Sequence, residues 1–277
     1  MKQNKILTRS SIIISLSFIS VVLLSQEKVR NIEYHPELGQ EGKDVRWFPT
    51  PQLLVDRMLD MAKITPEDFL IDLGSGDGRT VITAAKRGLH AIGIEYNPDL
   101  VKLSKENAVK EKVADKVDFI EADLFAYDFS KATVITMFLL PEINLKLRPR
   151  LLDMKPGTRI VSTTFTMQNW QYDEVVKIDD KTSKWTTAYL WIVPAKVEGT
   201  WNISGGDIKL TQEFQMISGK LNMGGKSIEI SDGRLRGSDI TFISEGVRYD
   251  CRVYGNTMKG TSAKDGKVTA WEAIRQK

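Results

Sequence analysis

The chain has 277 residues, 42% hydrophobic and 27% charged, a composition typical of globular domains and unlike that of disordered or fibrous proteins. The 39 Lys and Arg residues against 36 Asp and Glu leave a formal net charge of +3 at pH 7, too weak a bias to indicate a nucleic-acid partner. One cysteine, Cys251, and two histidines exclude an intrachain disulfide and leave too few ligands for a structural zinc site, so we expect no bound metal.

The first 25 residues have the pattern of an export signal. Three basic residues precede a run from Ile12 to Leu24 that contains no charge. A basic stretch followed by about 7–15 apolar residues is typical of a secretory signal peptide. A buried amphipathic helix is the alternative structure, but a helix uncharged all round is not amphipathic. We expect residues 1–25 to be a signal peptide or membrane anchor that exports the protein or associates it with a membrane, with a cytoplasmic location as the alternative. Residues 26–44 are interpreted as a polar linker.

Residues 45–197 contain strand patterns that alternate with helix patterns. This alternation predicts βαβ units and a Rossmann-like, doubly wound, mainly parallel α/β sheet. The last two apolar segments, Glu174–Ile178 and Thr187–Val193, have no helix between them and are expected to pair as an antiparallel hairpin at the sheet edge. The other predicted strands are Phe69–Leu73, Ala91–Ile94, Val117–Ile120, Thr133–Phe138 and Arg159–Thr163, and the predicted helices begin at Thr50-Pro51, Thr80, Asn97-Pro98 and Pro141.

The composition changes at residue 198. From there on the chain holds 12 of its 20 glycines and none of its nine prolines. Short alternating segments are separated by Gly-Gly, Asp-Gly and Gly-Asn turns, which are typical of β-hairpins. We therefore predict a small antiparallel β-sandwich or barrel over residues 198–277. Its predicted strands include Ile208–Gln215, Lys226–Ile230, Asp239–Ile243, Tyr249–Tyr254 and Val268–Ala273.

A glycine-rich loop follows the first predicted strand. Three glycines stand at alternate positions from 74 to 78, and a helix begins at once. Glycines allow a sharp turn and a close approach of a ligand, and a helix N-terminus offers free N–H groups. Glu95 ends the second strand, where nucleotide-binding βαβ units place an acid on ribose hydroxyls. Asp123 follows the third strand, where a carboxylate can meet an adenine amino group.

In combination these motifs resemble the class I S-adenosylmethionine (SAM)-dependent methyltransferases, over roughly Val45–Val193. The loop reads Asp72-Leu-Gly-Ser-Gly-Asp-Gly78, whereas dinucleotide binders prefer G-x-G-x-x-G. A dinucleotide or other nucleotide binder is the alternative. The resemblance implies SAM as cofactor, with its methionine part on the first acid and the loop, its ribose on the second acid and its adenine on the third. The implied cofactor residues are Asp72, Gly74, Ser75, Gly76, Gly78, Glu95 and Asp123.

A narrower resemblance is to the family of the ATP synthase c-subunit lysine methyltransferase and its prokaryotic relatives. It rests on Val45-Arg-Trp-Phe-Pro-Thr-Pro51 and on Met137-Phe-Leu-Leu-Pro141, the latter where nucleobase methyltransferases carry Asn/Asp-Pro-Pro-Tyr. It implies a protein substrate and a lysine acceptor. Apolar walls around the lysine would lower its pKa and so favour the neutral amine. The candidates for those walls are Trp47, Phe48, Phe138, Leu139 and Pro141, and no catalytic base is identified. The C-terminal β module departs from this family, which does not require it.

Two alternatives remain beside the lysine acceptor. The first keeps the enzyme class but gives it a small molecule or a lipid as acceptor. The second is an exported binding protein that has lost catalysis and whose β module recognises a partner. Export motivates this second alternative, because SAM is made in the cytoplasm.

Overall fold

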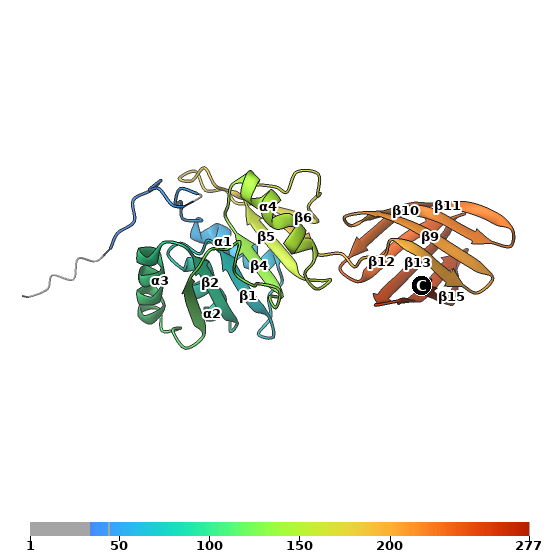
Figure 1. The fold of residues 1–277 in the computed structure, drawn as a ribbon, viewed down its shortest axis with the longest axis horizontal. Helices are drawn as coiled ribbons and strands as arrows, with labels where there is room; N and C mark the ends of the chain where they lie inside the picture. Colours follow the sequence, from blue (N-terminus) through green and yellow to red (C-terminus); the bar gives the residue numbers. More distant parts are fainter. Residues whose placement is uncertain (1–33, 44, 277) are drawn as a thin grey trace, which may run out of the picture. The chain divides into compact units, whose positions relative to one another are not determined.

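The computed structural model describes residues 34–43 and 45–276, so the predicted signal or anchor over residues 1–25 lies outside the described residues. The described chain forms a seven-stranded sheet with helices, followed by a closed antiparallel barrel (Figure 1). This architecture confirms the expected Rossmann-like sheet with a small all-β module after it. The boundaries at residues 44 and 197 stay predictions. None of the helices in the described ranges is long and apolar enough to cross a membrane.

The sheet has the strand order β3-β2-β1-β4-β5-β7-β6. Neighbouring strands are parallel from β3 through β5, and β7 runs antiparallel to both β5 and β6, which confirms the edge hairpin. The order reverses between β1 and β4, and ligands of open α/β sheets bind outside the carboxyl ends of the strands at such a point. The strands are β1 Phe69–Leu73, β2 His90–Glu95, β3 Val117–Glu121, β4 Val134–Met137, β5 Arg159–Thr163, β6 Glu174–Lys177 and β7 Thr187–Ile192.

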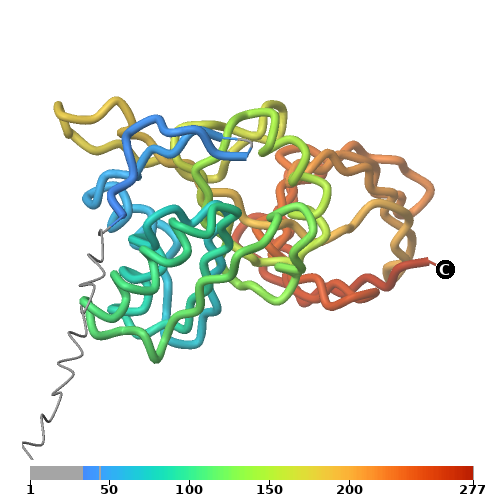
Figure 2. The backbone as a smooth tube through the Cα atoms, turned by 60° about the vertical axis from the view of Figure 1, so that its left-hand side comes forward, coloured from blue at the N-terminus to red at the C-terminus, as the bar shows by residue number. Residues whose placement is uncertain are grey.

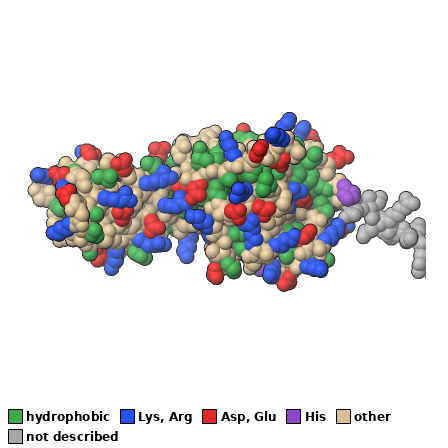
Figure 3. Space-filling model, turned by 180° about the vertical axis from the view of Figure 1, so that it is seen from behind, with side chains coloured by type: hydrophobic (Ala, Val, Ile, Leu, Met, Phe, Trp, Pro, Cys, Tyr) green, Lys and Arg blue, Asp and Glu red, His purple; other side chains and the backbone are tan. Residues whose placement is uncertain are grey.

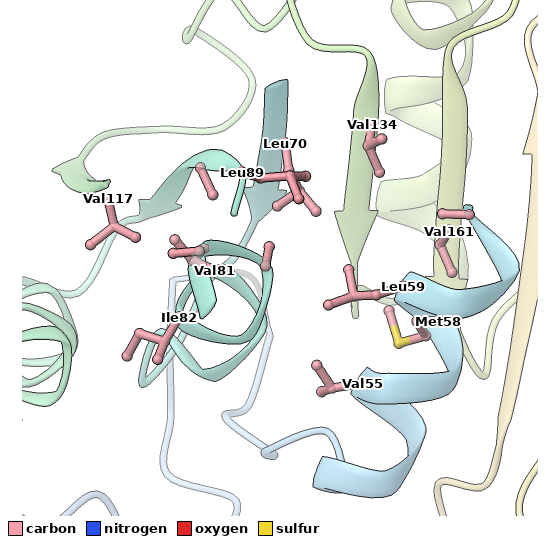
Figure 4. Packing of buried hydrophobic residues seen from close by; sticks show 14 of the residues in the cluster. Val55, Met58, Leu59, Leu70, Val81, Ile82, Leu89, Val117, Val134 and Val161 are labelled. Carbon is pink, nitrogen blue, oxygen red and sulfur yellow. The ribbon is translucent and has the colours of Figure 1, made fainter. Parts of the chain in front are cut away.

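Helices cover both faces of this sheet. Side chains alternate along each strand, so Leu70 of β1 packs on one face with α1, α2 and α3, whereas Ile71 packs on the other with α4. Figure 4 shows the first of these layers, where Val55 and Leu59 of α1 point toward the strands. The sheet is therefore doubly wound, as expected. The helices are α1 Gln52–Met61, α2 Arg79–Lys86, α3 Pro98–Lys110 and α4 Pro141–Leu152.

The helix starts agree with the sequence, with two differences of one residue, one of which is that α2 begins at Arg79 and not at Thr80. Asn97 precedes α3 as predicted, and its side chain accepts a hydrogen bond from Asp99 N at 2.9 Å. The first helix begins one residue later than predicted, at Gln52, and Pro51 takes the N-cap position in place of Thr50. Pro51 O accepts the N–H groups of Leu54 and Val55. Pro51 thus provides the first carbonyl acceptor of the helix and is not itself the first helical residue.

The C-terminal module is a barrel and not a sandwich. Each strand from β8 to β15 pairs with the next in antiparallel fashion, and β15 pairs back with β8. The corresponding backbone, orange to red, curves into a ring in Figure 2. Its interior is filled by apolar side chains, with Trp201 and Leu235 fully buried. The strands are β8 Gly199–Ile203, β9 Gly206–Glu213, β10 Met216–Met223, β11 Lys226–Arg236, β12 Asp239–Ser244, β13 Val247–Tyr254, β14 Thr257–Lys264 and β15 Lys267–Arg275.

Candidate active site

A pocket opens at the carboxyl ends of β1 and β4, where the strand order reverses. The loops after β1, β2, β3 and β4 contribute to it, and so does the segment that precedes α1. Ten of the predicted site residues line this pocket, whereas Gly78 and Pro141 lie just outside its lining. The ten are Trp47, Phe48, Asp72, Gly74, Ser75, Gly76, Glu95, Asp123, Phe138 and Leu139.

The glycine loop has a conformation that only glycine adopts readily. Gly74, Gly76 and Gly78 have φ values of 78°, 55° and 81°, which lie in the left-handed region. Space is also restricted, because a Cβ atom on Gly76 would lie 2.7 Å from Trp47 Nε1. The loop is tied to β2 because Gly74 N and Ser75 N both donate to Ile94 O, at 2.8 and 3.0 Å. Its backbone is therefore held in place beside the pocket.

Glu95 braces this loop from the end of β2. Its Oε2 accepts the N–H of Gly76 at 2.9 Å, and its Oε1 accepts those of Tyr96 and Asn97 at 2.9 and 3.0 Å. An ionised carboxylate has about four lone-pair sites, so three backbone bonds leave room for a further donor. Glu95 thus combines a structural role with the capacity to bind a ligand hydroxyl.

Asp72 is a buried carboxyl group at the floor of the pocket. It is 5% exposed, and Thr136 Oγ1 donates to its Oδ1 at 2.7 Å. Burial raises the pKa of Asp72 to about 7; the Thr136 hydrogen bond opposes the rise, while the negative charges of Glu95 and Asp77 add to it. A buried acid in this state is stabilised as a carboxylate when a positive charge comes near. The floor of the pocket therefore favours a cationic ligand.

Asp123 is bound by a residue that no sequence motif marks. Lys43 Nζ donates to Asp123 Oδ2 at 2.6 Å, and Phe125 N donates to Oδ1 at 2.8 Å. These two bonds, Lys43 first, lower the pKa of Asp123. Lys43 Nζ also lies 4.7 Å from the ring centroid of Tyr96. A ligand that bonds to Asp123 must therefore share this carboxylate with Lys43.

The other side of the pocket is apolar. Leu139, which follows β4, is 1% exposed and lies beside Gly74. Phe138 lines the pocket next to it, and Phe48 is 38% exposed. The indole of Trp47 also packs against the glycine loop, at Gly76. We therefore expect Trp47 to influence the part of the pocket beside the glycine loop as well as its apolar side.

Comparison with known proteins agrees with this geometry. Residues 72–174 match the model of the ANTKMT methyltransferase domain. A protein-lysine N-methyltransferase of Saccharolobus islandicus is 40% identical over 152 residues, which cover 54% of this chain and 94% of that protein. This chain belongs to the class I SAM-dependent methyltransferases. The matched residues 72–174 lie in the sheet module and contain the glycine loop, Glu95 and Asp123.

Two further relatives of this methyltransferase differ in how much of their own length matches this chain. The human lysine N-methyltransferase of the ATP synthase c-subunit is 37% identical over 107 residues, 38% of this chain and 46% of that protein. A crystal structure from Salinibacter ruber, described as an RNA methyltransferase in complex with S-adenosyl-L-homocysteine, is 46% identical with a TM-score of 0.51 and covers 54% of this chain and 96% of that chain. Both relatives are methyltransferases, but their described acceptors differ in chemical class.

Proposed function

We propose that this methyltransferase transfers a methyl group from SAM to the side-chain amine of a lysine in a protein substrate. The observation that carries the proposal is the division of the pocket into an acidic half and an apolar half. The acidic half holds Asp72, Glu95 and Asp123, and the apolar half holds Phe48 and Phe138. The Saccharolobus and human relatives, both named as lysine methyltransferases, support the same acceptor.

The acidic half fits SAM. Gly74, Ser75 and Gly76 line the pocket, where the absence of side chains on the two glycines allows a ligand to approach the backbone closely. The carboxyl group of Asp72 is stabilised as an anion by a positive charge, and SAM carries positive charge on its sulfur and its amino group. Glu95 has lone pairs left for ribose hydroxyls, and the position of Asp123 after β3 supports a contact with the adenine. When bound, SAM supplies a methyl group on a positively charged sulfur.

The apolar half would prepare a lysine amine to react. Lysine has four methylene groups that pack well against aromatic walls while its amine stays free. Removal of water by such walls disfavours the charged ammonium and lowers the pKa of the amine. Methyl transfer needs a positioned, desolvated nucleophile and no covalent enzyme intermediate. Phe48, Phe138 and Leu139 would supply the walls for this task.

RNA is a second candidate acceptor, because the Salinibacter relative is described as an RNA methyltransferase. A base taken out of its stack is held by hydrogen bonds to its Watson–Crick edge. The side chains of Phe48, Phe138 and Leu139 have neither donors nor acceptors for that edge. On the face shown in Figure 3, basic and acidic side chains are interspersed instead of forming a single basic surface. These features favour lysine over a nucleobase.

Labelling of a cell extract tests the acceptor. The full chain is incubated with tritiated SAM and an extract that contains proteins, RNA and lipids, and the label is measured in each fraction. We expect label in protein, and methyl-lysine after hydrolysis of the labelled bands. The Glu95→Ala variant is the control and should transfer little label. Label confined to RNA would establish the second candidate, and label confined to lipids or small molecules would also reject lysine.

We also propose that residues 1–25 direct the chain to or across a membrane. The uncharged run from Ile12 to Leu24 after a basic start supports this. Replacing Ile14, Leu16 and Ile19 with aspartate should leave the protein in the soluble cytoplasmic fraction, because charged residues in such a segment are costly to insert. Cell fractionation of both proteins measures the effect. A wild-type chain found in the cytoplasm with Met1 intact would contradict the proposal.

A further inference from the structure

Four aromatic rings lie together beside the apolar half of the pocket, and two of them were not among the predicted site residues. Trp185 is at their centre. Its ring centroid lies 5.8 Å from that of Phe48, 5.3 Å from that of Phe138 and 6.2 Å from that of Phe165. Phe138 and Phe165 are 6.5 Å apart. We call these four residues the aromatic wall.

The aromatic wall is assembled from four separate segments. Phe48 precedes α1, Phe138 follows β4, Phe165 follows β5, and Trp185 lies in the loop between β6 and β7. Phe48 and Phe138 line the pocket, and Trp185 and Phe165, which do not line it, extend the same apolar surface through their ring contacts. A single stretch of sequence could not build this surface, because it depends on the tertiary fold.

The aromatic wall is not part of the packed interior. Trp170, Trp191 and Trp201 are fully buried, whereas all four rings of the wall keep part of their surface exposed. In the described part of the chain, the buried core clusters do not include any of the four. Large aromatic side chains that are held together and yet remain accessible are typical of binding surfaces.

The backbone around the wall is specifically held. Thr164, directly before Phe165, has a φ of 70°, which is a rare conformation for a β-branched residue. Thr164 N donates to Thr187 O and Ser162 Oγ donates to Phe165 O, both at 2.8 Å. On the facing loop, Trp185 N donates to Ser183 Oγ at 3.0 Å. These bonds fix the direction of the chain at Phe165 and Trp185.

We propose that the aromatic wall binds the alkylammonium head of the acceptor, and that Trp185 and Phe165 are acceptor-binding residues. The proposal rests on the proposed function, which it deepens by naming how the acceptor is recognised. Ring faces attract cations, and tryptophan does so most strongly. Methylation removes N–H donors from an ammonium group. Aromatic rings, which accept few strong hydrogen bonds, therefore bind a methylated ammonium better than an acidic side chain would. The wall is thus chemically matched to a lysine amine that already carries methyl groups.

Binding of choline tests the wall without knowledge of the protein substrate. Choline carries a trimethylammonium group, and 3,3-dimethylbutan-1-ol has the same shape without the charge. Ligand-observed NMR on the full chain, with and without S-adenosylhomocysteine, should show choline bound at least about fivefold more tightly than its uncharged isostere. Trp185→Ala should abolish this preference and Trp185→Phe should retain most of it. The control Tyr254→Ala removes an aromatic ring that is 59% exposed in the barrel and should change nothing.

Either of two results would overturn the proposal. One is a wild-type protein that does not prefer choline to its isostere, and the other is a folded Trp185→Ala variant that keeps the preference. With a methylated protein substrate in hand, Trp185→Ala should raise KM for that substrate and leave the affinity for S-adenosylhomocysteine unchanged. If labelling instead rejects lysine as the acceptor, the choline measurement still reports on the wall, so the two failures are distinguishable.

Discussion

Replacing Asp72 with asparagine is expected to stabilise the cofactor-free protein at pH 8 by on the order of 4 kcal/mol. The pKa of Asp72 is about 7 in the folded protein, against an ordinary value of 3.8. Between these two values the folded state keeps a proton that the unfolded state releases, so stability falls as the pH rises through this window. Asparagine stays neutral and still accepts the Thr136 hydrogen bond. Urea unfolding at pH 5 and pH 8 measures the difference, which should fall to on the order of 2 kcal/mol at pH 5.

The same substitution should weaken binding of SAM. A positively charged ligand favours ionised Asp72, so the wild-type affinity should rise from pH 6 to pH 8, whereas the variant should bind weakly and with little pH dependence. Titration calorimetry with SAM at several pH values provides the measurement. Asp118→Asn is a suitable control, because Asp118 lies in β3 with its side chain 64% exposed. A wild-type affinity that does not change with pH would contradict the role of Asp72.

Replacing Glu95 with alanine should lower the affinity for S-adenosylhomocysteine about a hundredfold. The loss of two charge-assisted hydrogen bonds to ribose costs on the order of 3 kcal/mol. The substitution also removes the acceptor for Gly76 N, so the glycine loop loses its brace from β2. Titration calorimetry on folded variants measures the effect.

A second variant separates these two contributions of Glu95. Glu95→Gln keeps one oxygen that can accept backbone N–H groups but loses the negative charge and the second acceptor. Its affinity should fall between those of the wild type and the alanine variant. An affinity unchanged in both folded variants would show that Glu95 does not bind the cofactor.

The sheet module was predictable because its signals are local. The strand β1, the glycine loop and the acid at the end of β2 all stand within about 25 residues of one another. In addition, βαβ units connect parallel strands almost always by right-handed crossovers. In the barrel, β8, β10 and β14 are not among the predicted segments, and β14 carries few large apolar residues. Met258 is the one fully buried large side chain of β14. Pairing with neighbouring strands determines these strands more than their own composition does.

The parts of the site that were missed depend on contacts between distant residues. Lys43 and Asp123 are 80 positions apart, and nothing in the sequence around Lys43 distinguishes it from other surface lysines. Thr136 lies inside β4, and its hydroxyl contacts the buried Asp72 only because β1 and β4 pair. Phe165 and Trp185 stand in separate loops whose conformation sequence patterns do not specify.

The way in which the barrel closes has a consequence for its folding. Seven of its eight strand pairings join consecutive strands, which are local in sequence and cost little chain entropy to form. The eighth joins Ala273 of β15 to Ile203 of β8, across almost the whole module. Pairings of high contact order form slowly, so the hairpins should assemble first and the seam between β8 and β15 should close last. By the same reasoning the seam should open first, and amide hydrogens along it should exchange with solvent faster than those of the other strands.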